Sequence, residues 1–293
     1  MIYYFLPTGG VAGGVKVGFQ FMEALISLGV PGVVATPGGE AAQWFSCSVP
    51  VMDRGRALER ITPQDWAILN WPHDLDDLAA SGARLAAHVQ GVPDMEPVFR
   101  HPGVRFLTCW ETATQHLKKN YGHDPVFVGI SVSQCFFNQG EMKRDNQAAY
   151  MPRRGLSIAT RAARSLDHLD WHPLDGMDEA GICRHLHKAG VYLATAVKEQ
   201  FGLPPLEAMA AGCLVASVPV VGGMEFLRDG YNCLVDEPEA LVGRLKKLTR
   251  PEQAPLRELM RLRARATAYN YHPYTLKRRL AHLLDGPLEG LRA

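Results

Sequence analysis

The chain has 293 residues, of which 47% are hydrophobic and 21% charged, and its formal net charge is +1. This composition is typical of a globular protein with one large or two ordinary domains. The small net charge argues against a broad nucleic-acid-binding surface, and no apolar run approaches the roughly 20 residues of a membrane span. The six cysteines contain no C-x-x-C pair, which argues against a zinc knuckle or a disulfide framework and favours reduced thiols in a cytosol.

The first part of the chain alternates short apolar runs with segments of helical spacing. Strands are expected at 2–6, 32–36, 67–71, 84–89, 104–108 and 126–130, and helices at 15–29, 74–80 and 111–121. Continuous apolar strands that alternate with helices predict a parallel sheet covered on both faces. Residues 1–130 are therefore assigned to a Rossmann-like α/β domain.

A polar segment at 131–147 interrupts this alternation and is interpreted as a linker. Beyond it, strands are expected at 148–151, 167–171, 191–195 and 213–217, and helices at 154–165, 178–188, 204–211, 238–249 and 253–269. Residues 148–270 are therefore assigned to a second parallel-sheet domain, and residues 271–293 carry an amphipathic helix. Two such domains are expected to face a central cleft, because open parallel sheets bind ligands at the carboxyl ends of their strands.

A glycine-rich loop, PTGGVAGGVK (7–16), follows the first expected strand. Such a loop permits close approach of the backbone, and the amides of a helix start attract an anion. The loop lacks the spacing of a dinucleotide fingerprint or a P-loop, and the acid expected after the second strand is displaced to Glu40. A ligand role and a simple tight turn both stay open for this loop.

The stretch KEQFGLPPLEAMAAG (198–212) places two acids around a helix start. Pro204 and Pro205 favour extended backbone followed by the first turn of a helix. Glu207 then falls in that turn, and Glu199 lies in the loop before it. Carboxylates placed in this way accept hydrogen bonds from hydroxyls, as in the recognition of a sugar or a ribose. The alternative is that Glu207 only complements the helix dipole.

Residues 198–235 resemble the donor-binding region of retaining glycosyltransferases with the GT-B fold (group 1, or family 4-like, enzymes). That family carries E-x7-E, E-A-M-A-x-G, G-G-x-E and D-G-x-N, which occur here in order at Glu199/Glu207, 207–212, 222–225 and 229–232. The resemblance implies two Rossmann-like domains and transfer of a hexosyl or deoxyhexosyl group from a nucleotide-diphosphate sugar to an acceptor hydroxyl. It also implies retention of configuration, no metal and no cofactor.

The resemblance assigns roles to individual residues of the second domain. Glu207 would hold the ribose hydroxyls, and Glu199 would lie near the transferred sugar. The amides that would contact this sugar are those of Phe201, Gly202 and Leu203. The family also places an arginine and a lysine on the donor diphosphate.

The segment YMPRRG (150–155) stands where the family has its diphosphate-binding arginine. Arg153 and Arg154 would therefore bind the diphosphate, because charge-assisted bonds from arginine suit phosphate oxygens. The expected lysine is missing, and Arg161 is the nearest basic residue. A solvated helix start is the alternative for both arginines.

The resemblance extends more loosely to the first domain. Gly13 and Gly14 match the family's glycine-rich loop at the donor. His88, or else His73, would face the acceptor, with Gln90 as a polar partner, although a lone histidine is more often structural. The expected catalytic residues are therefore Glu199, His88, Arg153 and Arg154. The helix at 271–284 would cross back to the first domain.

Three other interpretations stay open. An epimerase or a phosphorylase can use the same fold, and Lys198 is the one lysine considered for a pyridoxal cofactor. A nucleotide-sugar-binding protein without transfer is the second, and a dinucleotide oxidoreductase is the third. DLDD (74–77) is interpreted as a helix start and not as a metal site.

The acceptor is expected to be a glycan, a lipid-linked molecule or a small molecule. We expect a cytoplasmic protein whose basic segment LKRRLAHLL (276–284) could contact the inner face of a membrane.

Overall fold

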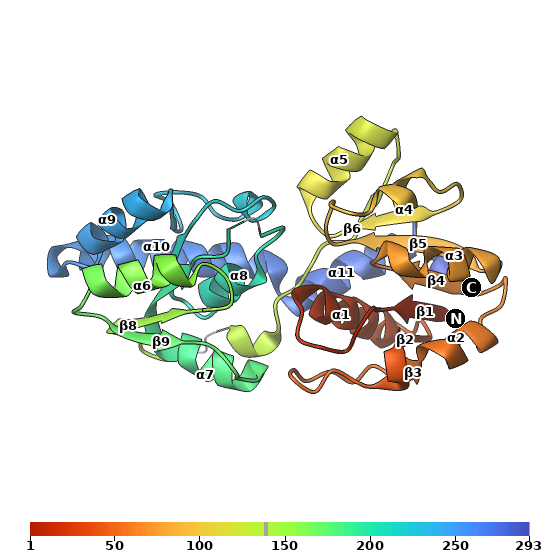
Figure 1. The fold of residues 1–293 in the computed structure, drawn as a ribbon, viewed down its shortest axis with the longest axis horizontal. Helices are drawn as coiled ribbons and strands as arrows, with labels where there is room; N and C mark the ends of the chain where they lie inside the picture. The colour runs from red at the N-terminus through yellow and green to blue at the C-terminus, as the bar shows by residue number, and fades with distance from the viewer. Residues whose placement is uncertain (138–139, 198, 293) are drawn as a thin grey trace. The chain divides into compact units, whose positions relative to one another are not determined.

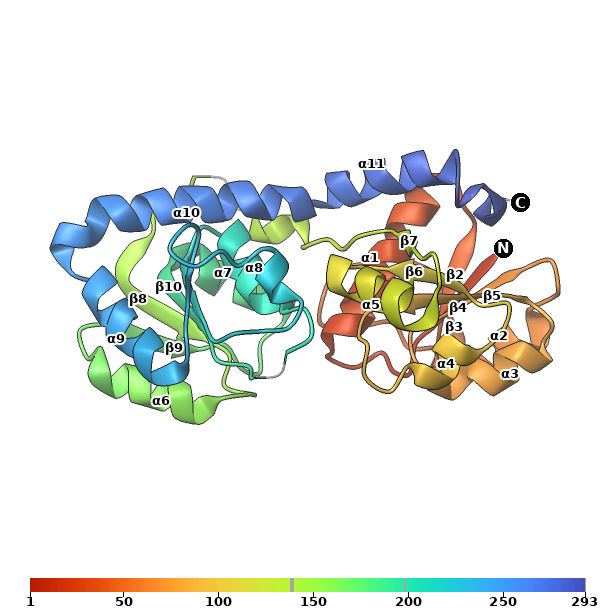
Figure 2. The ribbon, with the colours of Figure 1, turned by 90° about the horizontal axis from the view of Figure 1, so that it is seen from above.

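The structure is a computed structural model that describes residues 1–137, 140–197 and 199–292. It divides into two compact units, which we call the N-terminal unit (residues 1–131 with 273–293) and the C-terminal unit (residues 132–272). Each unit contains a parallel sheet with helices on both faces (Figures 1 and 2). The expected architecture of two parallel-sheet α/β domains is confirmed.

The N-terminal unit contains a seven-stranded sheet in the order β3-β2-β1-β4-β5-β6-β7. Its strands are β1 (Ile2–Phe5), β2 (Gly32–Thr36), β3 (Val51–Asp53), β4 (Trp66–Leu69), β5 (Arg84–Val89), β6 (Arg105–Thr108) and β7 (Val126–Phe127). Every neighbouring pair is parallel. The strand order reverses between β1 and β4, so the loops after these two strands lie where ligands bind in such sheets.

Helices α1 (Gly13–Ser27) and α11 (Pro273–Leu284) cover one face of this sheet, and α3 (Leu75–Ala80) and α4 (Glu96–Arg100) lie on the other (Figure 2). Helices α2 (Arg54–Arg60) and α5 (Glu111–Tyr121) complete the unit. The apolar side of α11 carries Leu276, Leu280 and Leu284, which are buried in one hydrophobic cluster with Phe19 and Met22 of α1. Because this side is used inside the unit, α11 is part of its core.

The C-terminal unit contains a five-stranded parallel sheet in the order β12-β11-β10-β8-β9. Its strands are β8 (Arg144–Tyr150), β9 (Asp170–Pro173), β10 (Ala189–Ala194), β11 (Leu214–Ser217) and β12 (Leu234–Val235). Helices α6 (Leu156–Ser165) and α9 (Pro238–Leu248) cover one face, and α7 (Glu179–Lys188), α8 (Leu203–Ala210) and α10 (Ala254–Ala268) cover the other (Figure 2). The strand order reverses between β8 and β10.

Short 3-10 helices occupy several connections in both units. They are η1 (Pro37–Gly39), η2 (Pro72–Asp74), η3 (Gln134–Phe136), η4 (Gly223–Glu225), η5 (Pro251–Gln253), η6 (Tyr269–Tyr271) and η7 (Glu289–Leu291).

Strand β8 differs most from the sequence-based expectation. It begins at Arg144, inside the segment expected to be a linker, because its first residues are polar and exposed and so lack an apolar pattern. Its backbone nevertheless pairs with β10, where Arg144 faces Ala189. Backbone pairing, which the side chains of 144–147 do not reveal, therefore sets the start of this strand.

Candidate functional site

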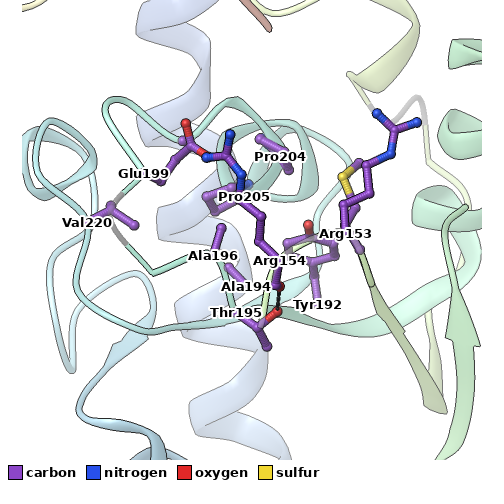
Figure 3. Close-up of a pocket in the computed structure, with 12 residues that line it drawn as sticks. Arg153, Arg154, Tyr192, Ala194, Thr195, Ala196, Glu199, Pro204, Pro205 and Val220 are labelled. Atoms are coloured by element: carbon purple, nitrogen blue, oxygen red, sulfur yellow. Dashed lines mark hydrogen bonds and ion pairs between the residues drawn. The ribbon is translucent and has the colours of Figure 1, made fainter. Parts of the chain in front are cut away.

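A pocket of about 130 Å³ lies at the carboxyl edge of the C-terminal sheet, where the strand order reverses. Its walls come from the loop after β8, the loop after β10 and the start of α8 (Figure 3). The lining residues are Met151, Arg153, Arg154, Tyr192, Ala194, Thr195, Ala196, Glu199, Gly202, Pro204, Pro205 and Val220. Four residues that the sequence predicted at different points of the chain, Arg153, Arg154, Glu199 and Gly202, are therefore brought together.

The start of α8 forms one wall of this pocket. Gly202, the residue before the helix, has a φ of 87°, a left-handed conformation in which any side chain would be strained. Leu203 begins the helix, and Pro204 and Pro205 occupy the first turn, where the missing proline N–H is not needed. The sharp turn at Gly202 and the two prolines thus bring the positive end of the α8 dipole to the pocket.

The two acids of the E-x7-E motif lie at different depths. Glu199 lines the pocket with 28% of its side chain exposed, whereas Glu207 is only 6% exposed and lies within α8. Tyr192 also lines the pocket and is buried, and this burial raises the pKa of its phenol, with a smaller contribution from the carboxylate of Glu207.

Arg154 reaches across the pocket to Glu199. Its Nη1 lies 3.0 Å from Glu199 Oε2, and its backbone oxygen accepts a hydrogen bond of 2.7 Å from Thr195 Oγ1 (Figure 3). The guanidinium of Arg153 points away from this pair (Figure 3), and its Nε lies 3.6 Å from Asp175 Oδ1. In the structure the ion pair therefore holds Arg154 beside the pocket.

Arg161 lies apart from this group. It pairs with Glu239 and is not among the residues that line the pocket. In the described part of the chain, no lysine is among the residues that line the pocket.

The loop from Glu199 to Gly202 is fixed by a second loop. Val221 N donates to Glu199 O at 3.1 Å, and Gly222 N donates to Gln200 O. Phe201 is buried, with its ring centroid 5.4 Å from that of Phe226. The G-G-x-E segment therefore supports the backbone that carries Glu199.

The D-G-x-N motif stabilises the loop that follows. Asn232 is fully buried, donates to Phe226 O at 2.8 Å and to Thr267 Oγ1 at 2.9 Å, and accepts from Arg228 N. Asp229 Oδ1 accepts from Val235 N at 2.9 Å. These contacts are structural: both side chains hold the backbone in place and lie outside the lining of the pocket.

His88 does not have the environment that the sequence led us to expect. Its ring is fully buried, Nδ1 lies 2.8 Å from Tyr4 Oη and Nε2 lies 3.0 Å from Cys109 Sγ. Burial lowers the pKa of His88 to about 3. The prediction that His88 faces an acceptor is wrong in this structure, because strand β5 is covered on both faces and the histidine is part of the core.

The glycine-rich loop of the N-terminal unit lies beside two other polar side chains. A Cβ on Gly14 would lie 2.6 Å from Gln90 Oε1 and 3.9 Å from Asn70 Nδ2, so the glycine leaves room for the Gln90 side chain at the helix start. Gln90 Oε1 and Asn70 Oδ1 are buried and have no hydrogen-bond partner among the described residues. Asn70 was not predicted as a site residue, although its place directly after β4 was a usable signal.

The remaining residues that the sequence singled out in this unit lie elsewhere. Gly13 begins α1 and is exposed, and His73 is also exposed. The DLDD segment binds an arginine: Arg54 Nε lies 2.8 Å from Asp74 Oδ1, and Arg54 Nη2 lies 2.6 Å from Asp77 Oδ2. Both acids therefore have a structural partner.

Two further points concern ligands. In residues 1–137, 140–197 and 199–292, no group of three or more His, Cys, Asp or Glu side chains is arranged to hold a metal ion. Lys198, which was considered for a pyridoxal cofactor, lies outside the described residues.

Residues 169–267 match the family model described as glycosyl transferases group 1. A sequence search finds no match among curated proteins. Within residues 1–137, 140–197 and 199–292, no helix is long and apolar enough to cross a membrane.

Several solved structures have the same fold as the whole chain. A glycosyltransferase from Rickettsia africae is 14% identical with a TM-score of 0.73, and 98% of each chain is covered. WaaG, a glycosyltransferase involved in lipopolysaccharide biosynthesis, is 14% identical with a TM-score of 0.70 over 98% of this chain and 100% of its own. Anabaena HepE in complex with UDP is 13% identical with a TM-score of 0.74 over 97% and 99%. The resemblance to GT-B glycosyltransferases is therefore confirmed at the level of the fold.

Proposed function

We propose that the protein is a glycosyltransferase that moves a sugar from a nucleotide-diphosphate sugar to an acceptor hydroxyl, with retention of configuration and without a metal ion. The observation that carries this proposal is the pocket that joins Arg154, Glu199 and the start of α8 at the carboxyl edge of the C-terminal sheet. The family match over residues 169–267 supports it. The solved HepE complexes with UDP and with UDP-glucose make uridine-diphosphate sugars the first donors to test.

Each part of the pocket has a role in this proposal. Arg154 donates charge-assisted hydrogen bonds to the diphosphate, and Arg153 joins it after a change of rotamer. The N-terminus of α8 and the amides of Phe201, Gly202 and Leu203 face the diphosphate and the sugar. Glu207 accepts bonds from the ribose hydroxyls, and Glu199 accepts bonds from hydroxyls of the transferred sugar. Gly13 and Gly14 remain predicted donor-binding residues, because glycines at a helix start permit close approach of the backbone to a ligand.

Transfer needs one bond exchange and one proton transfer. The bond between the sugar's anomeric carbon and the diphosphate oxygen breaks, and the acceptor oxygen forms a bond to the same carbon on the same face. The acceptor's proton goes to the leaving diphosphate. Arg154 and the α8 amides stabilise the negative charge that develops on the diphosphate, an effect commonly worth about 2.7–4 kcal/mol per well-placed donor.

Binding is tested by thermal unfolding with a panel of nucleotide sugars. We expect at least one of them to raise the midpoint of unfolding of the wild-type protein, and Arg154→Gln and Glu207→Gln to reduce that increase. Arg161→Gln is the matched control, because Arg161 pairs with Glu239 outside the pocket. Failure of every nucleotide sugar to stabilise the protein, together with a Glu207→Gln variant that behaves as wild type, would refute the proposal.

Transfer is tested separately with the donor that binds. Turnover is followed with glycan, lipid-linked and small-molecule acceptors in the presence of a chelator, and the product's anomeric configuration is read by NMR. Binding without transfer or donor hydrolysis would instead indicate a nucleotide-sugar-binding protein. Epimerised or phosphorolysed sugar would indicate the other enzymes that use this fold.

A cytoplasmic location and peripheral contact with a membrane belong to the same proposal. The apolar side of α11 is buried in the N-terminal unit. Membrane contact would therefore rest on exposed basic side chains such as Arg278.

A further inference from the structure

We propose a second ligand site in the C-terminal unit, which binds a small organic phosphate at the opposite edge of the sheet from the pocket described above. The site is a cavity of about 350 Å³. Its charged lining residues are Glu141, Lys143, Asp145, Glu258, Arg261 and Arg265, and Gly212 also lines it. Its existence does not depend on the proposed transferase activity.

The cavity lies at the amino edge of the C-terminal sheet. Lys143 and Asp145 stand at the start of β8, and Gly212 lies between the end of α8 and the start of β11. The donor pocket is lined instead by residues that follow β8 and β10. Because all strands of this sheet are parallel, the two sites lie at opposite edges.

Three basic side chains converge on this cavity. Arg261 and Arg265 are four residues apart on α10, so they lie on the same side of the helix. A Cβ on Gly212 would lie 3.3 Å from both Lys143 Cε and Arg265 Cδ. The absence of a side chain at Gly212 therefore lets Lys143 and Arg265 approach each other.

Each of the three acids that line the cavity has a basic partner. Asp145 Oδ2 lies 2.8 Å from Arg257 Nη2, and Asp145 Oδ1 lies 2.6 Å from Arg261 Nη2. Glu258 pairs with Arg261 Nη1, and Glu141 Oε2 lies 3.0 Å from His187 Nδ1. None of these ion pairs involves Lys143 or Arg265.

Donors on all three basic groups are left for a ligand. Arg261 Nε is buried without a hydrogen-bond partner in the described part of the chain, and the side chain of Arg265 has no hydrogen bond or ion pair with the described residues. Lys143 Nζ donates to Leu186 O at 2.6 Å and lies 3.8 Å from Cys213 Sγ. Neither partner carries a full negative charge, because one is a backbone carbonyl oxygen and the other is a protonated thiol.

Phosphate is the chemistry that fits these donors. An arginine presents several N–H groups in a planar fork and a lysine adds a compact positive charge, a combination that matches phosphate oxygens. Leaving a buried guanidinium N–H unpaired is unfavourable, and a phosphate oxygen would satisfy it. Burial lowers the pKa of Lys143, so a bound anion would favour the charged form of its amine.

The size of the cavity favours a phosphate ester over a free ion. A single water needs only about 10–15 Å³ of such volume, so the space holds many more heavy atoms than one phosphate group. We therefore expect a phosphate monoester of a small polyol to bind more tightly than inorganic phosphate.

The test uses calorimetric titration of the full chain with inorganic phosphate and with glycerol phosphate. All variants carry Arg154→Gln, which removes the basic side chain beside the donor pocket. We expect this background to bind glycerol phosphate, and the added change Arg265→Gln to weaken that binding at least tenfold. Arg263→Gln is the matched control on the same helix, because the Arg263 guanidinium lies 4.4 Å from the Tyr231 ring centroid.

A second pair of variants checks the buried cation. Lys143→Gln should also weaken binding, and Lys143→Arg should restore part of it if the variant's thermal unfolding matches that of the background. No binding of either phosphate to the Arg154→Gln protein, or equal loss in the Arg265→Gln and Arg263→Gln variants, would overturn the proposal. Tighter binding of inorganic phosphate than of glycerol phosphate would overturn its ester component.

Discussion

The buried histidine of the N-terminal unit should make this unit sensitive to acid. His88 is enclosed by Tyr4 and Cys109, and burial lowers its pKa to about 3. In the unfolded chain a histidine has a pKa of about 6.5. Between these two values the unfolded state binds one more proton than the folded state, so the free energy of unfolding must fall as the pH falls.

The size of the effect follows from the two pKa values. The contribution of neutral His88 to the free energy of unfolding is fully present above pH 6.5. Below that pH it falls by about 1.4 kcal/mol for each pH unit, until the pH reaches the pKa of His88 in the folded protein. From pH 8 to pH 5 the loss is therefore about 2 kcal/mol. His88→Gln removes the titrating group and with it this part of the pH dependence, whatever constant cost the substitution has.

The assay is urea unfolding of wild type and His88→Gln between pH 5 and pH 8, followed by tryptophan fluorescence. Four of the five tryptophans lie in the N-terminal unit: Trp44, Trp66, Trp71 and Trp110. We expect the difference in unfolding free energy between the two proteins to shrink by about 2 kcal/mol from pH 8 to pH 5. A difference that stays constant across this range, or a His88 NMR titration near pH 6.5, would show that the ring is accessible to protons and the reasoning wrong.

Three other predictions concern separate contacts. Glu199→Gln breaks the partly exposed ion pair with Arg154, so it should tighten binding of a nucleoside diphosphate up to about fivefold while it slows sugar transfer. Weaker binding of the nucleoside diphosphate in a titration would contradict this. Leu280→Ala should lower the free energy of unfolding of the N-terminal unit by about 2–5 kcal/mol, because Leu280 is fully buried in its core. The exposed control Arg278→Ala should change this free energy little, and equal losses for the two variants in urea unfolding would count against a core role for α11. Asn232→Ala leaves its buried partners unpaired, so it should lower the free energy of unfolding by about 1–3 kcal/mol without changing the KM for the donor. A large rise in that KM without a loss of stability would mean that Asn232 contacts the donor directly.

The fold was predictable where apolar side chains mark the elements. Helix α1 and strand β5 lie close to their expected positions because their buried residues follow the helical and extended periods. Strands β3 and β12 have three and two residues, which are too few for a pattern, so neither was predicted. The first half of β8 was missed for another reason, since polar residues form its ladder.

The start of α8, which lines the proposed donor pocket, was predictable from local chemistry, but the contacts within the pocket were not. Gly202 and the two prolines that follow it specify the start of α8 by backbone preference alone. The Arg154–Glu199 pair depends on the adjacency of β8 and β10, which no local pattern encodes. The burial of His88 was partly readable, because it lies in the continuous apolar run of a strand covered on both faces.

The return of the chain to its first unit has a consequence for synthesis on the ribosome. The core of the N-terminal unit includes three leucines of α11, yet all of residues 132–272 are translated before them. At a translation rate of about 5–20 residues per second, the apolar side of α1 has no partner helix for tens of seconds or less. By the time α11 is made, all of the C-terminal unit has been translated and lies outside or near the exit of the ribosomal tunnel. The amino-terminal domain usually folds first, but here the packing of α11 against α1 can complete the N-terminal unit only after the C-terminal unit has been made. Chaperone binding during translation should therefore concentrate on α1.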